Sequence, residues 1–560
     1  MSCWSWAAGA IVVGVVVGGP WAWGSTGASG GVGDGGVSDG RRGAFSEEEI
    51  ETVREVLRPE NIRHEEGFCH IASLGLGREG DKEGRSLCVL MEDGKEVGPA
   101  RAPHADIRAR GMGRYSHWTS GQIYFSAGDN SDPRVNGREY ALVSRERIAR
   151  HTFAREVSAA ETAYGIEATV DRPIRNRRLI IRNLDPRVAV APHLTVEGWP
   201  DLASVEGMLA SILSPDMTAE QRAIAIWRFL VDWRYHYYPA EEGDEVHDPV
   251  KFINVYGYGF CDDSALNFAV LCRAAGLRAR FWGLEGHVVG EAFFDGGWHM
   301  FDPDHEVFYR AADGRIVGVE ELAANPGLIT ARATDPIGSD SASIARLYTT
   351  TENNRPHEGA VMGGARLDPV LYPGDEVIFD LGERAMARRV AFRDQPLPPM
   401  LGNGRLVRQI SVKGEGNHAE VRVDWPYVIL GGELSLDLSV AGAPIAVSIS
   451  DRGDPFTSIR TEVRGMSLVA NLGDWLGGRK AAPYGYVLRL ASGDGRRLEN
   501  VIRGGWLTTR FQFAPRALPQ IRPGATPFHL RLFAPGGGPL PGDWRGVEVI
   551  QEWDEIIGAP

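Results

Sequence analysis

A cysteine, a histidine and an aspartate follow one another over a short part of the chain, as Cys261, His287 and Asp302. A thiol becomes a nucleophile when a neighbouring imidazole accepts its proton, and a carboxylate can hold that imidazole in the required tautomer. Such a set attacks a carbonyl carbon through sulfur while the histidine takes and returns the proton. Such chemistry requires that the surrounding sequence bring these three side chains together.

The segment that begins at Cys261 is predicted to be a helix. Apolar residues recur at helical spacing from Cys261 to Ala275, and Gly276 is typical of the residue that follows a helix. Cys261 then lies in the first turn, where the helix dipole lowers the pKa of a thiol. Because Asp262 and Asp263 act in the opposite direction, we expect pairing with a histidine to be what lowers the pKa of Cys261.

The run HVVGEAFFDGGWHMFDPD, residues 287–304, is typical of a β-hairpin with its tip near residue 296. His287 opens the first strand and Asp302 lies on the second, so that positions near 290 and 302 should face one another. Neighbouring side chains on one face would allow Asp302 to accept the Nδ1 proton of His287.

An amphipathic helix is predicted before the cysteine. Thr218 and Gln221 have the spacing of a capping box, and apolar residues follow at helical intervals, namely Ile224, Trp227, Leu230 and Val231. This helix should pack on the core that carries the cysteine.

The segments GFCDDSALNFAVLCRAAGLRARF and GHVVGEAFFDGGWHMFDPD together resemble the core of the transglutaminase-like superfamily, a branch of the papain-like thiol enzymes. The resemblance covers less than a quarter of the 560 residues. It implies that Cys261 is the nucleophile, His287 the base and Asp302 the orienting carboxylate. The chemistry that it implies requires no metal and no organic cofactor.

Aromatic residues near the predicted site are assigned to substrate binding: Trp227, Trp233, Tyr256 and Trp298. The first three are also candidates for the side chain that completes an oxyanion hole with the main-chain N–H of Cys261, although core packing is an alternative for each. Where the family often has an aromatic residue after the histidine, this chain has two valines and then Gly290, which suggests an open groove.

A metal site is the main chemical alternative. Several possible ligands crowd the same region, namely Cys261, His287, His299, Asp302, Asp304 and His305. The histidines form no His-x-His or His-x-x-x-His pair, so we expect no metal.

We predict an α+β multidomain protein, since 560 residues exceed what one hydrophobic core usually supports. The predicted parts are a signal peptide or N-terminal membrane anchor (1–24), a Gly/Ser-rich linker (25–44), a β-rich N-terminal domain (45–195), a transglutaminase-like, papain-like domain (196–345) and an antiparallel β-sandwich-like C-terminal domain (346–560). The N-terminal domain is expected to open with a short helix over residues 46–59.

Residues 4–23 are uncharged, with tryptophans on both sides of an apolar centre, and indicate possible membrane anchoring. We therefore expect a secreted or membrane-anchored, extracytoplasmic protein, or a cytoplasmic one if the start codon is misassigned. Cys69 and Cys88 could form a disulfide there or remain two buried thiols. A net charge of −14 argues against a nucleic-acid partner.

The most favoured function is that of an amidase-like or protease-like hydrolase acting on a protein, peptide or glycopeptide. Water is favoured over an amine as the group that resolves the thioester, because Gly290 suggests an open groove and no amine pocket is evident. A cross-linking transglutaminase and a noncatalytic transglutaminase-fold binding module are the alternatives. Nothing in the sequence indicates the oligomeric state.

Overall fold

The structure is a computed structural model. It describes residues 49–74, 78, 80–83, 86–119, 121–236, 244–337, 339–350, 354–359, 363–384, 401–477 and 482–558. The predicted signal peptide or anchor (1–24) and the linker (25–44) lie outside the described residues. Within those described ranges, no helix has both the length and the apolar character needed to cross a membrane.

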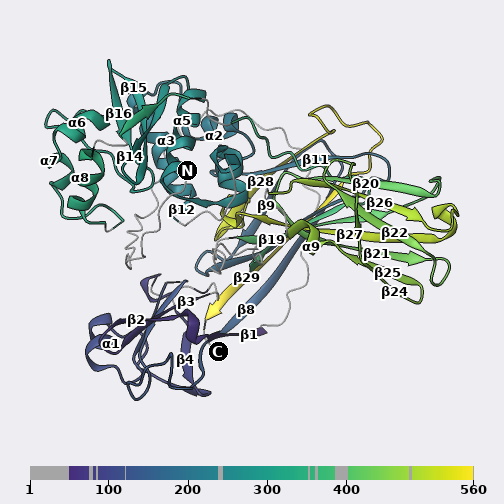
Figure 1. The fold of residues 1–560 in the computed structure, drawn as a ribbon, viewed down its shortest axis with the longest axis horizontal. Coiled ribbons are helices and arrows are strands. Elements are labelled where there is room, and N and C mark those ends of the chain that lie inside the picture. Colours follow the sequence, from purple (N-terminus) through teal and green to yellow (C-terminus); the bar gives the residue numbers. More distant parts are fainter. Residues whose placement is uncertain are drawn as a thin grey trace.

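The fold is mixed α+β and rich in strands, with most helices in the middle of the chain (Figure 1). One sheet of 12 strands runs through the molecule. Eleven of them lie in the order β24 (Thr461–Arg464), β25 (Ser467–Asn471), β21 (Ile429–Leu438), β27 (Ile502–Phe513), β19 (Gly402–Ile410), β18 (Glu376–Arg384), β10 (Ile174–Asn183), β29 (Val547–Gly558), β8 (Tyr140–Val157), β4 (Cys88–Glu92) and β5 (Lys95–Glu96), and β1 (Glu49–Leu57) pairs with β8.

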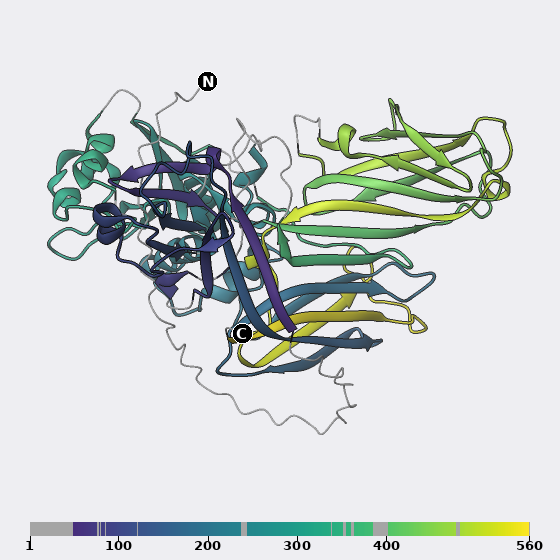
Figure 2. The same ribbon diagram turned by 90° about the horizontal axis from the view of Figure 1, so that it is seen from below.

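Two further sheets cover the long sheet, as Figure 2 shows. One has the order β11 (Ala191–Val196), β28 (Gly524–Phe533), β9 (Glu161–Ala168), and the other β20 (His418–Asp424), β26 (Gly485–Ser492), β22 (Ile445–Ser450), β23 (Thr457–Ile459). Tyr164 of β9 donates a hydrogen bond to Gln551 of β29 (3.1 Å), and the hydroxyls of Tyr486 on β26 and Thr509 on β27 are 2.6 Å apart. The largest hydrophobic core lies between these layers and continues into the helical middle of the chain, where it includes Phe229 and Phe268.

Strands from opposite ends of the sequence share these sheets. Ile174 of β10 is paired with Glu555 of β29, and Ala191 of β11 with Phe533 of β28. The helical middle region leaves the sheets after β11 and returns at β18. It is thus held between strands that belong to one continuous β framework.

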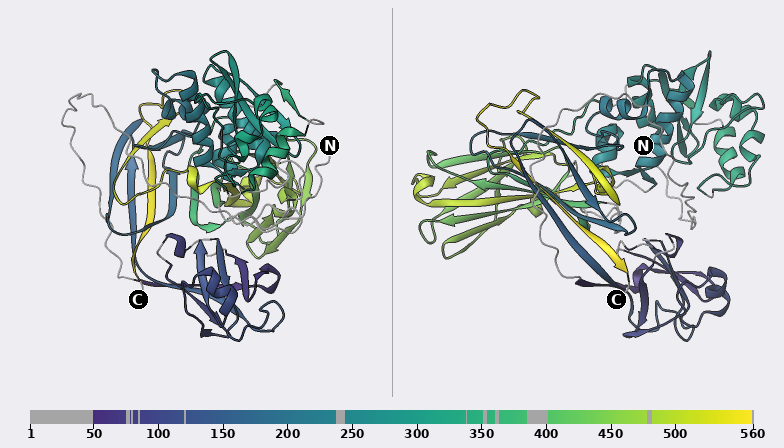
Figure 3. Two further views of the ribbon diagram at one scale, coloured as in Figure 1. Left: turned by 90° about the vertical axis from the view of Figure 1, so that its left-hand side faces the viewer. Right: turned by 180° about the vertical axis from the view of Figure 1, so that it is seen from behind.

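The N-terminal part adds a four-stranded sheet in the order β2 (Ile62–Glu66), β3 (Cys69–Ser73), β7 (Gln122–Phe125), β6 (Tyr115–Thr119), which packs against α1 (His104–Arg110). This sheet and the helical middle region lie at the same end of the long sheet (Figure 3). Cys69 and Cys88 are both buried and free, so they do not form the disulfide that the sequence left open.

The helix expected over residues 46–59 is wrong. Residues Glu49–Leu57 form β1, paired in register with Tyr140–Ile148 of β8. From residue 50 to 57, exposed positions alternate with more buried ones, which is the period of a strand. The hydrogen bonds offered by β8 outweigh the helix propensity of this Glu-rich segment.

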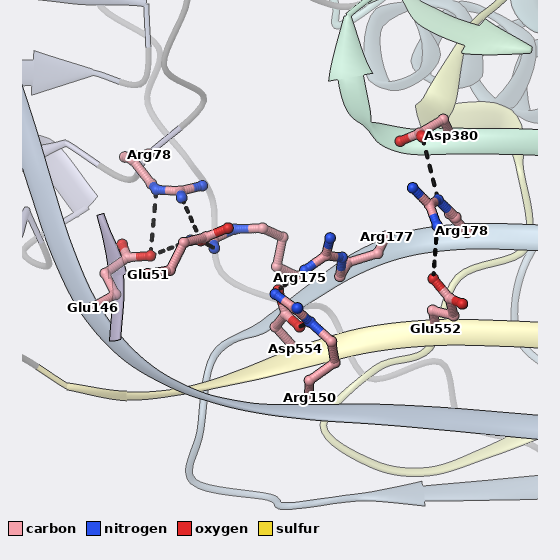
Figure 4. Close-up of polar contacts among 10 residues, drawn as sticks. All are labelled: Glu51, Arg78, Glu146, Arg150, Arg175, Arg177, Arg178, Asp380, Glu552 and Asp554. Atoms are coloured by element: carbon pink, nitrogen blue, oxygen red, sulfur yellow. Dashed lines mark hydrogen bonds and ion pairs between the residues drawn. The ribbon is translucent and has the colours of Figure 1, made fainter. Parts of the chain in front are cut away.

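Ion pairs fix this N-terminal part to the long sheet (Figure 4). Arg78 lies 2.6 Å from Glu51 of β1 and 3.3 Å from Glu146 of β8, and Arg175 of β10 lies 2.9 and 2.6 Å from the same two carboxylates. Arg78 and Glu146 are buried. Removing one partner would leave buried charge uncompensated, which typically costs about 3–5 kcal/mol.

The middle region contains the helices α2 (Val205–Ile212), α3 (Ala219–Trp233), α4 (Pro249–Lys251), α5 (Cys261–Ala274), α6 (Val319–Ala324), α7 (Gly327–Thr330) and α8 (Ser341–Thr349); α9 (Gly473–Gly477) lies later in the chain. Its antiparallel sheet has the order β16 (Gly297–Phe301), β15 (His287–Phe294), β14 (Arg278–Leu284), β17 (Arg355–His357), and β12 (Tyr235–His236) pairs in parallel with β13 (Tyr258–Gly259). Helix α5 packs against β14, β15 and α3.

Candidate active site

Cys261 is the first residue of α5 and is partly exposed. The Asp263 carboxylate accepts a hydrogen bond from the main-chain N–H of Phe260 at 2.9 Å and so stabilises the start of the helix. Gly276, with φ of 81°, follows its end. The helix predicted from Cys261 to Ala275 is therefore confirmed, with the thiol in the first turn.

His287 and Asp302 are brought together by the predicted hairpin. Gly290 of β15 is paired with Phe301 of β16, which places the first residue of β15 beside the residue that follows β16. Nε2 of His287 lies 2.7 Å from Oδ2 of Asp302, and both side chains are buried. We expected the carboxylate to accept the Nδ1 proton, but its partner is Nε2. Nδ1 is then the ring nitrogen that remains for the thiol.

The sulfur of Cys261 lies near the same imidazole. Sγ of Cys261, a ring nitrogen of His287 and a carboxylate oxygen of Asp304 are all within 4.8 Å of one another. The main-chain N–H of Val288 also donates a hydrogen bond to the sulfur. The fold therefore assembles a thiol, an imidazole and its carboxylate, with a second carboxylate beside them.

The electrostatics of the thiol differ from our expectation. Burial, together with the negative charges of Asp304 and Asp262, raises the pKa of Cys261 well above its ordinary value. Burial opposes ionisation of Asp302 as well, but His287 and His305 outweigh it and hold the pKa of that carboxyl below its usual range. The resting site thus contains a neutral thiol, and attack by sulfur requires the imidazole to remove the proton as the bond forms.

The other oxygen of Asp302 is also held. Oδ1 accepts hydrogen bonds from the main-chain N–H groups of Asp304 and His305, each at 3.0 Å. The ring of His305 packs edge-on against His287, with 4.6 Å between centroids, and its Nδ1 lies 2.8 Å from Asp335. These contacts fix the orientation of the His287–Asp302 pair.

The thiol, the imidazole and the carboxylate that it contacts lie within a segment that matches a known protein family. Residues 207–303, which include Cys261, His287 and Asp302, match the model described as the transglutaminase-like superfamily. The chain contains a transglutaminase-like superfamily domain. The match begins within α2 and ends just after Asp302, so the domain lies in the middle of a larger chain.

No curated protein matches the chain. Among solved structures, a putative protease from Parabacteroides distasonis aligns at 8% identity and a TM-score of 0.13, with 79% of this chain and 91% of that chain covered. At this TM-score the alignment does not indicate a shared fold, and we infer nothing from it about the transglutaminase-like domain.

The aromatic residues assigned to substrate binding lie in different surroundings. Trp227 is next to the site, because its indole N–H donates to the main-chain oxygen of Asp302 at 3.1 Å. Tyr256 is buried and its hydroxyl donates to Glu245. Trp233 packs on Trp199, and the guanidinium of Arg280 lies over Trp298. Their role in substrate binding stays a prediction.

Gly290 does not border an open groove, contrary to our interpretation of the sequence. A Cβ atom at this position would lie 2.4 Å from Cδ1 of Phe268 in α5. The glycine allows β15 to approach the helix that carries the cysteine. His287 begins this strand and Cys261 begins this helix, so the close approach also brings the two elements of the site together.

Of the possible metal ligands, His299 is turned away from the site, whereas the others cluster around His287. Both ring nitrogens of His299 contact main-chain oxygens, of Ile316 at 2.5 Å and Phe294 at 2.9 Å, so this histidine is turned away from the site. His287 belongs to two groups whose ligand atoms lie within 4.8 Å, one with Cys261 and Asp304 and one with Asp302 and His305. The same side chains suit thiol chemistry, and the expectation that no metal is needed stays a prediction.

Asp304 links the site to two residues that we missed in the sequence. Its carboxylate lies 2.8 Å from Nδ1 of His236 and 3.2 Å from the guanidinium of Arg234. Both residues follow α3 within the run WRYHYY, of which we singled out only Trp233 from the sequence. The pairing of His236 in β12 with Gly259 in β13 brings this segment beside Cys261.

Proposed function

We propose that the transglutaminase-like domain performs thiol-dependent acyl chemistry on amide bonds, as an amidase-like or protease-like hydrolase of a protein, peptide or glycopeptide. The observation that carries the proposal is the 2.7 Å contact between His287 and Asp302 beside the sulfur of Cys261. A carboxylate on Nε2 keeps a proton there, so that Nδ1 presents its lone pair to the thiol.

In the proposed reaction, Sγ of Cys261 attacks the amide carbonyl carbon while Nδ1 of His287 takes the thiol proton. The C=O electron pair moves to oxygen, and on its return the C–N bond breaks and His287 protonates the leaving amine. Water then attacks the thioester, gives a proton to His287 and releases the acid, and the thiol is restored. Asp302 stays ionised throughout and stabilises the imidazolium.

Two other functions are alternatives to the proposed hydrolase. An amine could replace water, which would make the protein a cross-linking transglutaminase; the argument for water that rested on Gly290 no longer applies, because that glycine packs on α5. The raised pKa of the Cys261 thiol favours the other alternative, a noncatalytic binding module.

The flanking β-rich parts would recruit a macromolecular substrate. In this proposal the N-terminal β-rich domain (45–195) and the β-sandwich-like C-terminal domain (346–560) position it, and residues 4–23 export or anchor the chain so that it acts outside the cytoplasm. The ion pairs of Arg78 and Arg175 would keep the N-terminal part at a fixed place relative to the long sheet.

A product assay tests the proposal. The full chain is incubated with a glutamine-containing peptide library and an excess of a labelled primary amine, and mass spectrometry follows release of free acid and incorporation of the amine. We expect mainly free acid, lost in Cys261→Ser and retained in Cys272→Ser, which changes a fully buried thiol near the C-terminal end of α5. Mainly amine incorporation would favour the transglutaminase, and no Cys261-dependent product would favour the binding module.

A further inference from the structure

A histidine–aspartate pair that the reaction above does not use lies next to Cys261. His236 in β12 is paired with Gly259 in β13, two residues before the cysteine. Its ring packs against Phe260 with 5.0 Å between centroids. Main-chain pairing and ring packing together place this imidazole at the start of α5.

The buried Asp304 holds that ring. Oδ1 of Asp304 lies 2.8 Å from Nδ1 of His236 and 3.2 Å from the buried guanidinium of Arg234. Although burial opposes ionisation, Arg234 and His236 outweigh it and keep the pKa of the Asp304 carboxyl below its usual range. Asp304 is therefore a fixed negative charge that accepts the Nδ1 proton.

Exposure differs sharply within the pair. The side chain of His236 is 40% exposed, whereas that of Asp304 is 4% exposed. Because Nδ1 is turned to the carboxylate, Nε2 is the ring nitrogen left to contact a substrate. The carboxylate itself lies within 4.8 Å of the attacking sulfur, so the imidazole that it holds is near the bond that forms.

We propose that His236 is a further catalytic residue, whose Nε2–H donates to the carbonyl oxygen of the substrate as that oxygen becomes negative. Asp304 is the positioning residue that orients the ring. This inference rests on the proposed acyl chemistry of Cys261. With Nδ1–H donated to Asp304, the ring donates from Nε2 as the imidazolium. The charged or titratable groups that meet at the same carboxylate are Arg234, at 3.2 Å, and Cys261 and His287, within 4.8 Å.

A second donor comes from the main chain. The N–H groups in the first turn of a helix have no partner within the helix, and Cys261 occupies that turn. A main-chain N–H and His236 would then hold the oxygen together, as in other oxyanion holes. Of the residues expected for this role, Trp227 already donates its N–H to the main-chain oxygen of Asp302, and the Tyr256 hydroxyl is buried on Glu245.

Two probes separate this role from an effect on the thiol. Acylation of Cys261 by p-nitrophenyl acetate passes through a tetrahedral oxyanion, whereas alkylation by iodoacetamide displaces iodide and forms none. In His236→Ala we expect acylation to fall by about 10²-fold or more, the typical cost of losing one oxyanion donor. Alkylation should stay unchanged, and His236→Gln, which keeps an N–H donor, should recover part of the acylation rate.

The matched control is His247→Ala, which removes another histidine paired with an aspartate of α5, Asp263, at 3.3 Å. We expect it to keep both rates. An unchanged acylation rate in His236→Ala, or an equal fall in both rates with the fold intact by thermal melting, would overturn the role of His236. If wild-type Cys261 is alkylated but never acylated, the proposed function itself fails, and this result is distinct from the other two.

Discussion

Nε2 of His287 donates a hydrogen bond to Oδ2 of Asp302 across 2.7 Å, and the second oxygen of that carboxylate is held by two main-chain N–H groups. The carboxylate cannot turn away without losing three hydrogen bonds. The imidazole is thereby held with its proton on Nε2 and with Nδ1 unprotonated, which is the form that can act as a base toward Cys261.

Asp302→Asn tests this relationship. Because Oδ1 accepts two main-chain N–H bonds, the amide would present its NH₂ group to Nε2. This favours the tautomer with its proton on Nδ1, which cannot accept the thiol proton. We expect acylation of Cys261 to fall by about 10³–10⁴-fold with little change in the melting temperature. Asp335→Asn, which alters the neighbouring His305–Asp335 pair, is the control and should cost far less.

The raised pKa of Cys261 predicts an unusual alkylation profile. The thiolate fraction at neutral pH should be small, so iodoacetamide should react slowly at pH 7 and faster as the pH rises above 9. Because Asp304 is the charge that raises this pKa most after burial, Asp304→Asn should move the profile to lower pH. A wild-type profile that is already flat at pH 6 would contradict this account, as would equal labelling of the fully buried Cys272.

Gly290→Ala tests the packing of the hairpin on the helix. The added Cβ would lie 2.4 Å from Cδ1 of the buried Phe268, and we expect β15 and α5 to move apart to relieve this contact. We expect a loss of about 1–3 kcal/mol in unfolding free energy together with reduced acylation, because His287 moves away from Cys261. Gly165→Ala in β9 is the control, since its Cβ would meet nothing within 4 Å. Wild-type activity and stability in Gly290→Ala would contradict the prediction that a side chain here moves His287 away from Cys261.

The His305 pair predicts a pH dependence of stability. Burial lowers the pKa of His305, but Asp302 and Asp335 outweigh it and raise the value from 6.5 to about 9. The folded state therefore binds this proton more tightly, so the contribution is fully present below about pH 6.5 and is lost as the pH rises through about 9. It amounts to about 3 kcal/mol.

Melting temperatures measured between pH 6 and 10 check this sign. The wild-type protein should lose stability across the alkaline part of the range, and His305→Gln should lose less there because it has no proton to release. A steeper alkaline loss in the variant than in the wild type would be incompatible with a raised pKa.

Features set by local chemistry were predicted well from the sequence. The capping box of Thr218 and Gln221, the start of the helix at Cys261 and the tip of the hairpin all depend on residues a few positions apart. Because the tip of the hairpin fixes its register, it could also be predicted that His287 and Asp302 lie close together. These are the features that resemblance to the superfamily also covers.

Features that depend on distant parts of the chain were missed. The pairing of Ile174 with Glu555 has no local signal, and Glu49–Leu57 form a strand because β8 offers an edge. The choice of Nε2 and the role of Gly290 depend on how β15 meets α5, and His236 reaches the site only through β12 and β13. No period or spacing encodes those contacts.

The central claim, that Cys261 forms an acyl-enzyme with the help of His287, is tested most directly by locating the acyl group itself. The full chain is treated briefly with p-nitrophenyl acetate, quenched in acid and digested, and the acetylated peptide is identified by mass spectrometry. The account predicts an acetyl thioester on Cys261 that hydroxylamine removes, that forms at least about 10²-fold more slowly in His287→Ala, and that is absent in Cys261→Ser. Acetylation confined to lysines, or equal acetylation of the wild-type protein and Cys261→Ser, would contradict it.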